Sequence, residues 1–358
     1  MKRFLIVLLL ASLCCNVFAQ KEKHQKHVKK IHNKAVKMPK GEAVWQKGAT
    51  FSLFAGQTGS KNWAAGSDLF SLSVNAFGNA YANRTRGRWF WNNQLALSYG
   101  LINTDEFRTI KNDDKIDYFT TLGFNTKHLK HIGVGSAFGF RTQFSNGYDR
   151  NYLNQGLKRR TSGIFAPAYV TLAPIGIQWQ TKHLTFYAGP AARAVIVSNQ
   201  PYSYVYQGGD IPGTLVNDKN TNTKEVSLAQ MYGVDPAKEV RWEYGAYLSL
   251  GYNVSLCKNV NYSGRMDVFG DVNHHSPQNA EVFWTNMFTL KVNNWLRVVY
   301  SLDAAYDDNI KKFGYFHNHS DFQVKSILGV GVSLNSGWGM HGKMHRKMGE
   351  NLDLKMSK

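Results

Sequence analysis

The feature that most constrains the fold is a two-residue alternation of apolar and polar side chains that recurs along most of the chain. Successive side chains of a β-strand point to opposite faces, so this alternation predicts strands with one apolar and one polar face. In the segment 295–306, one parity begins with Leu296 and Val298, and the other carries Arg297 and Asp303. One face of such a strand suits lipid, and the other suits water.

The alternation predicts twelve strands. They are expected near 49–57, 67–83, 88–102, 115–126, 132–145, 162–180, 184–198, 240–256, 260–272, 281–292, 295–307 and 322–336. The connections between them are long and short in turn. The short ones are 84–87, 127–131, 181–183, 257–259 and 293–294, and the greatest long one is 199–239. In bacterial outer-membrane barrels, short turns face the periplasm and long loops face outside. The chain is therefore expected to be an all-β, antiparallel transmembrane β-barrel of about 12 strands with both termini periplasmic.

Tryptophan placement gives an independent indication of the same architecture. Six tryptophans lie within four residues of an expected strand end: Trp89, Trp91, Trp179, Trp242, Trp284 and Trp295. This placement is typical of the aromatic girdles at the two membrane interfaces. A soluble β-sandwich is the alternative, but it would place its large aromatic side chains mid-strand in a shared core.

The N-terminus predicts export. Met1-Lys2-Arg3 is positively charged, residues 4–13 are apolar, and Val17 and Ala19 occupy the positions that a signal peptidase reads. We expect a signal peptide at 1–19 that is cleaved near Ala19. Cys14 and Cys15 offer a lipoprotein alternative, although Leu13 before Cys14 and Cys14 before Cys15 are poor replacements for the small residue that precedes a lipidation site.

The remaining chain divides into three parts. They are a basic periplasmic leader at 20–44, the outer-membrane barrel at 45–336 and a basic, Met-rich periplasmic tail at 337–358. Without Lys2 and Arg3, the chain has 41 basic and 24 acidic residues, and segment 21–40 alone has a net charge of +7. An exported chain rarely meets nucleic acid, so the expected partners are outer-membrane lipid and, through the tails, peptidoglycan or other envelope proteins. The alternative is that the leader is a solvated, disordered segment.

Four motifs, in their order along the chain, resemble an uncharacterised Bacteroidota outer-membrane barrel family, domain of unknown function 3078. The motifs are Asn62–Gly66, Trp91–Gly100, Phe165–Tyr169 and Tyr306–Asp308. The resemblance covers roughly residues 45–336, and it departs from the family at Ser67 and at Ala304-Ala305. It implies a barrel and a phylum, but no activity.

Charged and polar side chains on the water-facing parity are the candidate functional residues. They are Arg141, Gln143, Glu243, Arg265, Asp267, Arg297, Asp303 and Lys325. Asp303 and Lys325 each lie about three residues from the outer end of adjacent strands, so we expect them to bridge across those strands. Charges inside a membrane barrel are functional candidates by default, and a self-neutralised plug is the alternative.

The strand number limits what such a barrel does. Eight strands just fill with side chains, whereas 16 to 18 leave an aqueous channel. Twelve strands therefore favour a narrow conduit or ligand-binding barrel for small polar solutes, or a closed scaffold subunit of an envelope assembly. The loop 199–239 would plug a conduit if it folds inward, and would meet a partner if it projects outward.

An enzymatic alternative rests on His274 and Ser276 near the outer end of the ninth expected strand. This His-x-Ser pattern is similar to outer-membrane phospholipase A, which implies His274 as base, Ser276 as nucleophile and Asn286 as the residue that orients the base. The continuation Ser276-Pro277-Gln278 departs from the Ser-Asn-Gly of that family. The alternative is an ordinary polar loop, and we expect no enzyme.

We also expect no cofactor and no metal. His317 and His319 have a usable spacing, but no thiolate lies nearby in the sequence. The acidic pairs Asp113-Asp114 and Asp307-Asp308 offer oxygen ligands for calcium, but their spacing is not that of a dedicated calcium loop.

Overall fold

The computed structural model describes residues 43–61, 71–104, 108–126, 129, 131–152, 157–181, 183–198, 228–235, 237–272, 280–293, 295–310, 320 and 322–338. The predicted signal peptide, the leader up to residue 42, the tail from residue 339 and most of the loop 199–239 lie outside the described residues.

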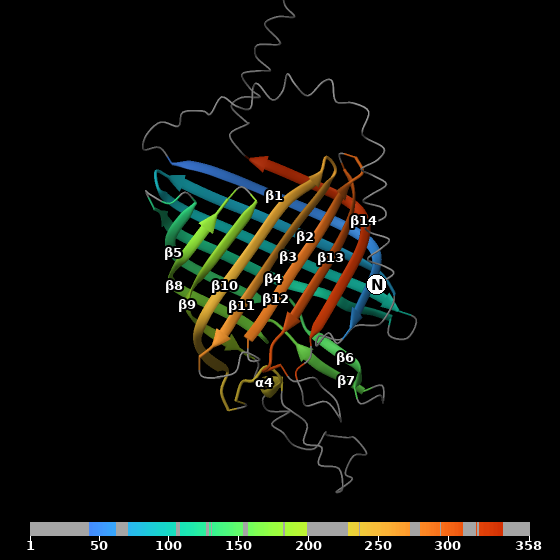
Figure 1. The fold of residues 1–358 in the computed structure, drawn as a ribbon. Coiled ribbons are helices and arrows are strands. Elements are labelled where there is room, and N and C mark those ends of the chain that lie inside the picture. The colour runs from blue at the N-terminus through green and yellow to red at the C-terminus, as the bar shows by residue number, and fades with distance from the viewer. Residues whose placement is uncertain are drawn as a thin grey trace, which may run out of the picture.

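Twelve antiparallel strands form one closed barrel (Figure 1). Each barrel strand pairs with the barrel strands before and after it in the chain, β5 pairs with β8 across the separate β6–β7 sheet, and β1 pairs with β14. The barrel strands are β1 (Val44–Lys61), β2 (Ser71–Arg86), β3 (Trp89–Thr104), β4 (Arg108–Asn125), β5 (Ile132–Thr142), β8 (Ala168–Gln180), β9 (Leu184–Ile196), β10 (Val240–Cys257), β11 (Val260–Asp271), β12 (Ala280–Lys291), β13 (Leu296–Tyr306) and β14 (Gln323–Trp338). The predicted all-β fold with twelve barrel strands is confirmed.

The start of β4 differs from the prediction. The sequence analysis expected a loop before residue 115, but β4 already begins at Arg108, so only residues 105–107 separate it from β3. Gly100 pairs with Asp113 and Leu101 with Lys111, which leaves Asn112 as a β-bulge. A bulge shifts the parity of the side chains by one, and the alternation was therefore hidden in this segment.

The connection between β5 and β8 also differs from the prediction. It contains a separate two-stranded sheet, β6 (Gly147–Tyr152) and β7 (Leu157–Ser162), where the sequence analysis expected a loop up to residue 161. The single strand expected at 162–180 is interrupted between β7 and β8. Pro167 lies in this interruption, and proline has no N–H to donate to a strand ladder.

The two ends of the barrel are different. At one end, called the turn end, short turns join β2 to β3, β4 to β5, β8 to β9, β10 to β11 and β12 to β13. Gly87 lies in the first of these turns with a φ of 61°, a conformation that glycine adopts without strain. The start of β1 and the end of β14 also lie at the turn end, because Lys47 pairs with Trp338. The opposite end, called the loop end, carries α4 (Leu228–Met231) and the β6–β7 sheet (Figure 1).

The outer face of the barrel is apolar. The six tryptophans singled out in the sequence are 39% to 61% exposed. Trp89, Trp179 and Trp295 lie near the turn end, whereas Trp242 and Trp284 lie near the loop end. Between them, large apolar side chains such as Val330 are exposed on the outside. This surface is the one that a membrane-spanning barrel presents to lipid. No helix among the described residues has both the length and the apolar character needed to cross a membrane.

Arginine substitutions on the outer face test whether this surface faces lipid. Val330 lies midway along β14 and Leu334 lies nearer the turn end, and both are exposed. We expect Val330→Arg to lower the free energy of unfolding by about 2 to 4 kcal/mol and Leu334→Arg by about 0 to 1 kcal/mol, because the cost of a cation falls from the bilayer midplane to its interface. Equilibrium guanidinium unfolding in lipid vesicles measures both values. Equal costs at the two positions would contradict the placement of the membrane.

Candidate functional site

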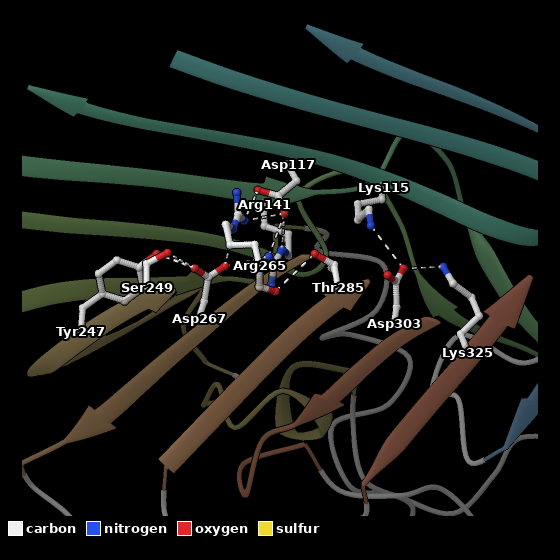
Figure 2. Close-up of polar contacts among 10 residues, drawn as sticks. All are labelled: Lys115, Asp117, Arg141, Tyr247, Ser249, Arg265, Asp267, Thr285, Asp303 and Lys325. Atoms are coloured by element: carbon white, nitrogen blue, oxygen red, sulfur yellow. Dashed lines mark hydrogen bonds and ion pairs between the residues drawn. The ribbon is translucent and has the colours of Figure 1, made fainter. Parts of the chain in front are cut away.

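Eight charged side chains in the interior of the barrel form one connected set, here called the charge network. They are Asp113, Lys115 and Asp117 on β4, Arg141 on β5, Arg265 and Asp267 on β11, Asp303 on β13 and Lys325 on β14. Figure 2 shows all of them except Asp113. Four are basic and four are acidic, so the network is neutral as a whole. Its side chains are at most 21% exposed.

Four of these residues form a closed ring of ion pairs. The Asp117 carboxylate accepts hydrogen bonds from Arg141 Nη2 and Arg265 Nη2, both at 2.7 Å. The Asp267 Oδ2 atom accepts hydrogen bonds from Arg265 Nε at 2.9 Å and from Arg141 Nη2 at 3.2 Å. Each carboxylate is thus shared between two guanidinium groups. Such shared, charge-assisted hydrogen bonds fix the geometry of all four side chains.

The other four residues continue the network along the barrel wall. Asp303 and Lys325 lie directly opposite each other in the pairing of β13 with β14, and Lys325 Nζ lies 3.5 Å from Asp303 Oδ2. Lys115 Nζ lies 3.2 Å from the same oxygen, and Lys325 also bonds to Asp113. Lys115 and Lys325 thus share Asp303, and Asp113 supplies the second negative charge that balances the two lysines.

The ion pairs cross the lumen. Asp117 and Arg265 stand on β4 and β11, which are separated by four other strands in the ring. Lys115 and Asp303 stand on β4 and β13, which are also separated by four strands. Because these strands face each other across the barrel, their side chains meet in its interior. Pairing places Arg265 opposite Thr285, Thr285 opposite Asp303 and Asp303 opposite Lys325, so one wall of the network follows a single row of the ladder.

Polar and aromatic side chains pack around the network. Tyr247 Oη and Ser249 Oγ donate hydrogen bonds to Asp267 Oδ1 at 2.9 and 2.7 Å. The Arg141 guanidinium lies 4.5 Å from the ring centre of Phe283, where a cation–π contact stabilises it. The cavity beside Asp117 has a volume of about 40 Å³. That volume holds a few water molecules at most and no larger solute.

An apolar cap covers the lumen at the loop end. It is formed by a cluster of buried side chains: Ala166, Tyr169, Val195, Val197, Leu228, Ala229, Met231, Tyr232, Val234 and Ile310. Leu228 and Met231 belong to α4 and are fully buried. The hydroxyl of Tyr232 donates a hydrogen bond to the carbonyl of Thr161 at 2.9 Å, which ties the cap to β7. The described lumen is therefore filled at two levels, by the cap and by the charge network.

A second set of charges lies between the cap and the network. Arg241 Nη2 lies 2.9 Å from Glu243 Oε1, and Arg193 Nε lies 3.7 Å from Glu243 Oε2. Arg193 also forms an ion pair with Glu281. Arg193, Glu243 and Glu281 are at most 3% exposed. The two glutamates form these buried ion pairs with two arginines, so the four charges balance.

The structure places the eight candidate residues from the sequence in different surroundings. Five of them, Arg141, Arg265, Asp267, Asp303 and Lys325, belong to the charge network. Glu243 belongs to the second set, and Gln143 lies just after β5, where it donates a hydrogen bond to the Ala166 carbonyl at 3.2 Å. Arg297 lies near the turn end of β13, opposite Lys291, and so lies apart from the others.

Several partners of these residues were not predicted as such from the sequence: Asp113, Lys115, Asp117, Arg193, Arg241 and Glu281. Lys115 and Asp117 were detectable, because they alternate with Ile116 and Tyr118 within the expected fourth strand. Arg193 was harder to place from the sequence. The residues around it in β9 are small on both faces of the strand, so no apolar and polar alternation shows which face is inward.

The enzymatic alternative stays a prediction. His274 and Ser276 lie outside the described residues. Asn286 lies midway along β12, where it accepts a hydrogen bond from Tyr262 Oη at 2.7 Å and donates one to the Leu302 carbonyl at 3.3 Å.

Among the metal candidates, His317 and His319 also lie outside the described residues. The calcium interpretation of Asp113-Asp114 is wrong, because both residues lie in β4 rather than in a loop and their carboxylates are engaged. Asp113 bonds to Lys325, and Asp114 Oδ2 bonds to Lys111 at 2.8 Å.

Comparison with known proteins gives a family match over part of the chain. The family described as "Protein of unknown function (DUF3078)" matches residues 55–148. Over these residues the predicted resemblance to this family is confirmed, and the phylum stays a prediction. Comparison with curated protein sequences gives no match.

Several solved structures are similar to this chain. The translocator domain of the autotransporter NalP from Neisseria meningitidis is 10% identical, with 86% of this chain and 93% of that chain covered and a TM-score of 0.29. The NanC porin is 10% identical, with 79% and 100% covered and a TM-score of 0.31. The toluene transporter TodX from Pseudomonas putida is 10% identical, with 82% and 90% covered and a TM-score of 0.26.

The hydrogen bond from Tyr247 provides a local test of the site. We expect Tyr247→Phe to lower the free energy of unfolding by about 1.5 to 3 kcal/mol, because it removes a buried hydrogen bond to a charged group. Tyr252→Phe is the matched control, since Tyr252 lies on the same strand and is exposed on the outside. Denaturant unfolding in vesicles compares the two, and equal values would show that the bond to Asp267 contributes nothing.

Proposed function

We propose that this protein is an integral outer-membrane β-barrel that acts as a narrow conduit for small polar solutes and is closed at rest. The observation that carries the proposal is the charge network, whose ion pairs join opposite walls of the barrel at Asp117–Arg265 and Lys115–Asp303. Side chains rather than backbone close the lumen at this level. Paired charges inside a membrane barrel are expensive to bury, and they mark the paths of polar solutes in many membrane proteins.

The lining of the rest of the lumen supports a polar solute. Many inward, buried side chains are hydroxyls or amides: Ser52, Ser73, Asn75, Ser98, Thr121, Gln178, Asn286, Ser301 and Ser333. One apolar cluster of Phe54, Phe77, Val299 and Ile327 lies among them. Hydroxyl and amide groups can replace part of the hydration of a polar solute as it passes. A neutral network in turn gives no preference for one sign of charge, so we expect weak selectivity between anions and cations.

A closed scaffold subunit of an envelope assembly is the second candidate. The observation that favours it is the filled interior, in which the apolar cap and the neutral charge network both occupy the lumen. A barrel whose interior is packed in this way can serve as a rigid membrane anchor without transporting anything.

Ion conductance across planar bilayers separates the two candidates. The measurement compares purified wild-type protein with a variant in which the arginines of the network are shortened. Conductance that rises in the variant supports a conduit that the network closes. Background conductance for both proteins would contradict the conduit, and stable partners recovered after mild detergent extraction would then favour the scaffold.

A further inference from the structure

Three acidic side chains meet at the loop end of the barrel, outside the charge network. Glu281 lies at the start of β12, and Asp307 and Asp308 follow the end of β13. Val282 pairs with Tyr306, so the two segments are neighbours in the sheet. One carboxylate oxygen from each of the three residues lies within 4.8 Å of the other two.

The burial of Asp307 is a second, independent observation. Asp307 is 1% exposed, and its Oδ2 atom has no hydrogen-bond partner among the described residues. The Oδ1 atom accepts a hydrogen bond from the backbone N–H of Asn309 at 2.9 Å. A buried carboxylate oxygen without a partner is costly, because water no longer solvates its charge. This group therefore has the free coordination capacity of a metal ligand.

The charge balance around this group also favours a cation. Arg193 and Arg241 form ion pairs with Glu243 and Glu281, and no ion pair from either arginine to Asp307 occurs within the described part of the chain. These two arginines and two glutamates balance in charge, and Asp307 adds a further buried carboxylate beside them. A bound cation would compensate the charge of Asp307.

We infer that Glu281, Asp307 and Asp308 form a binding site for one divalent cation of the calcium class. All three ligand atoms are carboxylate oxygens. Calcium and magnesium prefer oxygen ligands, whereas zinc also binds well to imidazole nitrogen and thiolate sulfur. Calcium–oxygen distances are about 2.3 to 2.6 Å, so two ligand oxygens on one ion can lie up to about twice that distance apart. The three carboxylate oxygens, which lie within 4.8 Å of one another, meet this limit. The Asn309 side-chain amide donates hydrogen bonds to Glu281 Oε1 at 3.3 Å and to Asp308 Oδ1 at 3.0 Å, and so orients two of the ligands.

The site joins two segments that close the loop end. Glu281 belongs to the barrel wall, whereas Asp307 and Asp308 lie three and two residues before Ile310, which is part of the apolar cap. A bound ion would therefore fasten the connection after β13 to β12 and stabilise the cap. This inference is independent of whether the barrel conducts.

Calorimetric titration with calcium tests the site on the purified, full chain in detergent after treatment with a chelator. We expect one calcium ion per chain, and we expect Asp307→Asn to weaken binding at least about tenfold because one anionic ligand is lost. Asp235→Asn is the matched control, since Asp235 is an exposed loop-end aspartate outside the cluster and its loss should leave the affinity unchanged. Heat-dependent migration on gels confirms that each variant is folded.

A second measurement applies to the wild-type protein alone, in case the Asp307 variant does not fold. Calcium should raise the thermal midpoint of the wild-type chain relative to the chelated sample, because an ion that binds only the folded state stabilises it. Absence of saturable calcium binding, an unchanged midpoint, or equal affinity in wild type and Asp307→Asn would each overturn the inference.

Discussion

Replacing Arg141 and Arg265 together with alanine is expected to raise the ion conductance of the barrel roughly tenfold over wild type, because both side chains span the lumen and ions then have to pass only the closure at the apolar cap. Each guanidinium bonds to Asp117 on β4 and to Asp267 on β11. Their removal leaves the two carboxylates facing an enlarged, water-filled space. The remaining negative charge should also make the variant prefer cations, which the reversal potential in a salt gradient measures.

A matched control removes two arginine side chains from another part of the barrel. Arg86 and Arg88 lie at the turn between β2 and β3, away from the charge network. Arg86→Ala/Arg88→Ala should leave the conductance at the wild-type level. If the lumen variant is folded and its conductance stays at the level of this control, the charge network does not close a conduit.

The fold was predictable because the strands of a membrane barrel alternate apolar and polar side chains with a two-residue period. Each of the twelve barrel strands corresponds to an expected one, since one face meets lipid and the other does not. The prediction was wrong where this rule is interrupted. The β-bulge at Asn112 changes the parity within β4, and the β6–β7 sheet lies outside the barrel, where no lipid imposes alternation.

The candidate site was predictable only in part, for a different reason. Parity in the sequence tells which side chains face inward, but it does not tell which strands face each other across the lumen. Asp303 and Lys325 are cross-strand neighbours, so their pairing follows from adjacent strands. The contact of Asp117 with Arg265 depends on the closure and diameter of the whole ring, which no local pattern records.

Asp117 is expected to be the side chain of the network whose loss destabilises the protein most. Asp117→Leu removes the carboxylate that both Arg141 and Arg265 share, and it leaves two buried cations with one remaining acidic partner, Asp267. Breaking a buried ion pair in this way costs about 3 to 5 kcal/mol in the free energy of unfolding. Denaturant unfolding of the variant in lipid vesicles measures this loss.

Replacing the whole ring of ion pairs should restore most of that stability. The variant combines Asp117→Leu, Arg141→Met, Arg265→Met and Asp267→Asn. No unpaired charge then remains in the ring, and such replacements of a buried ion-pair network by apolar side chains are often neutral or stabilising. We therefore expect this variant to unfold within about 1 to 2 kcal/mol of wild type. A loss as large as that of Asp117→Leu would show that the ion pairs themselves stabilise the barrel. Recovery would show that stability does not require charges at this position, which would support the proposal that they close a polar path.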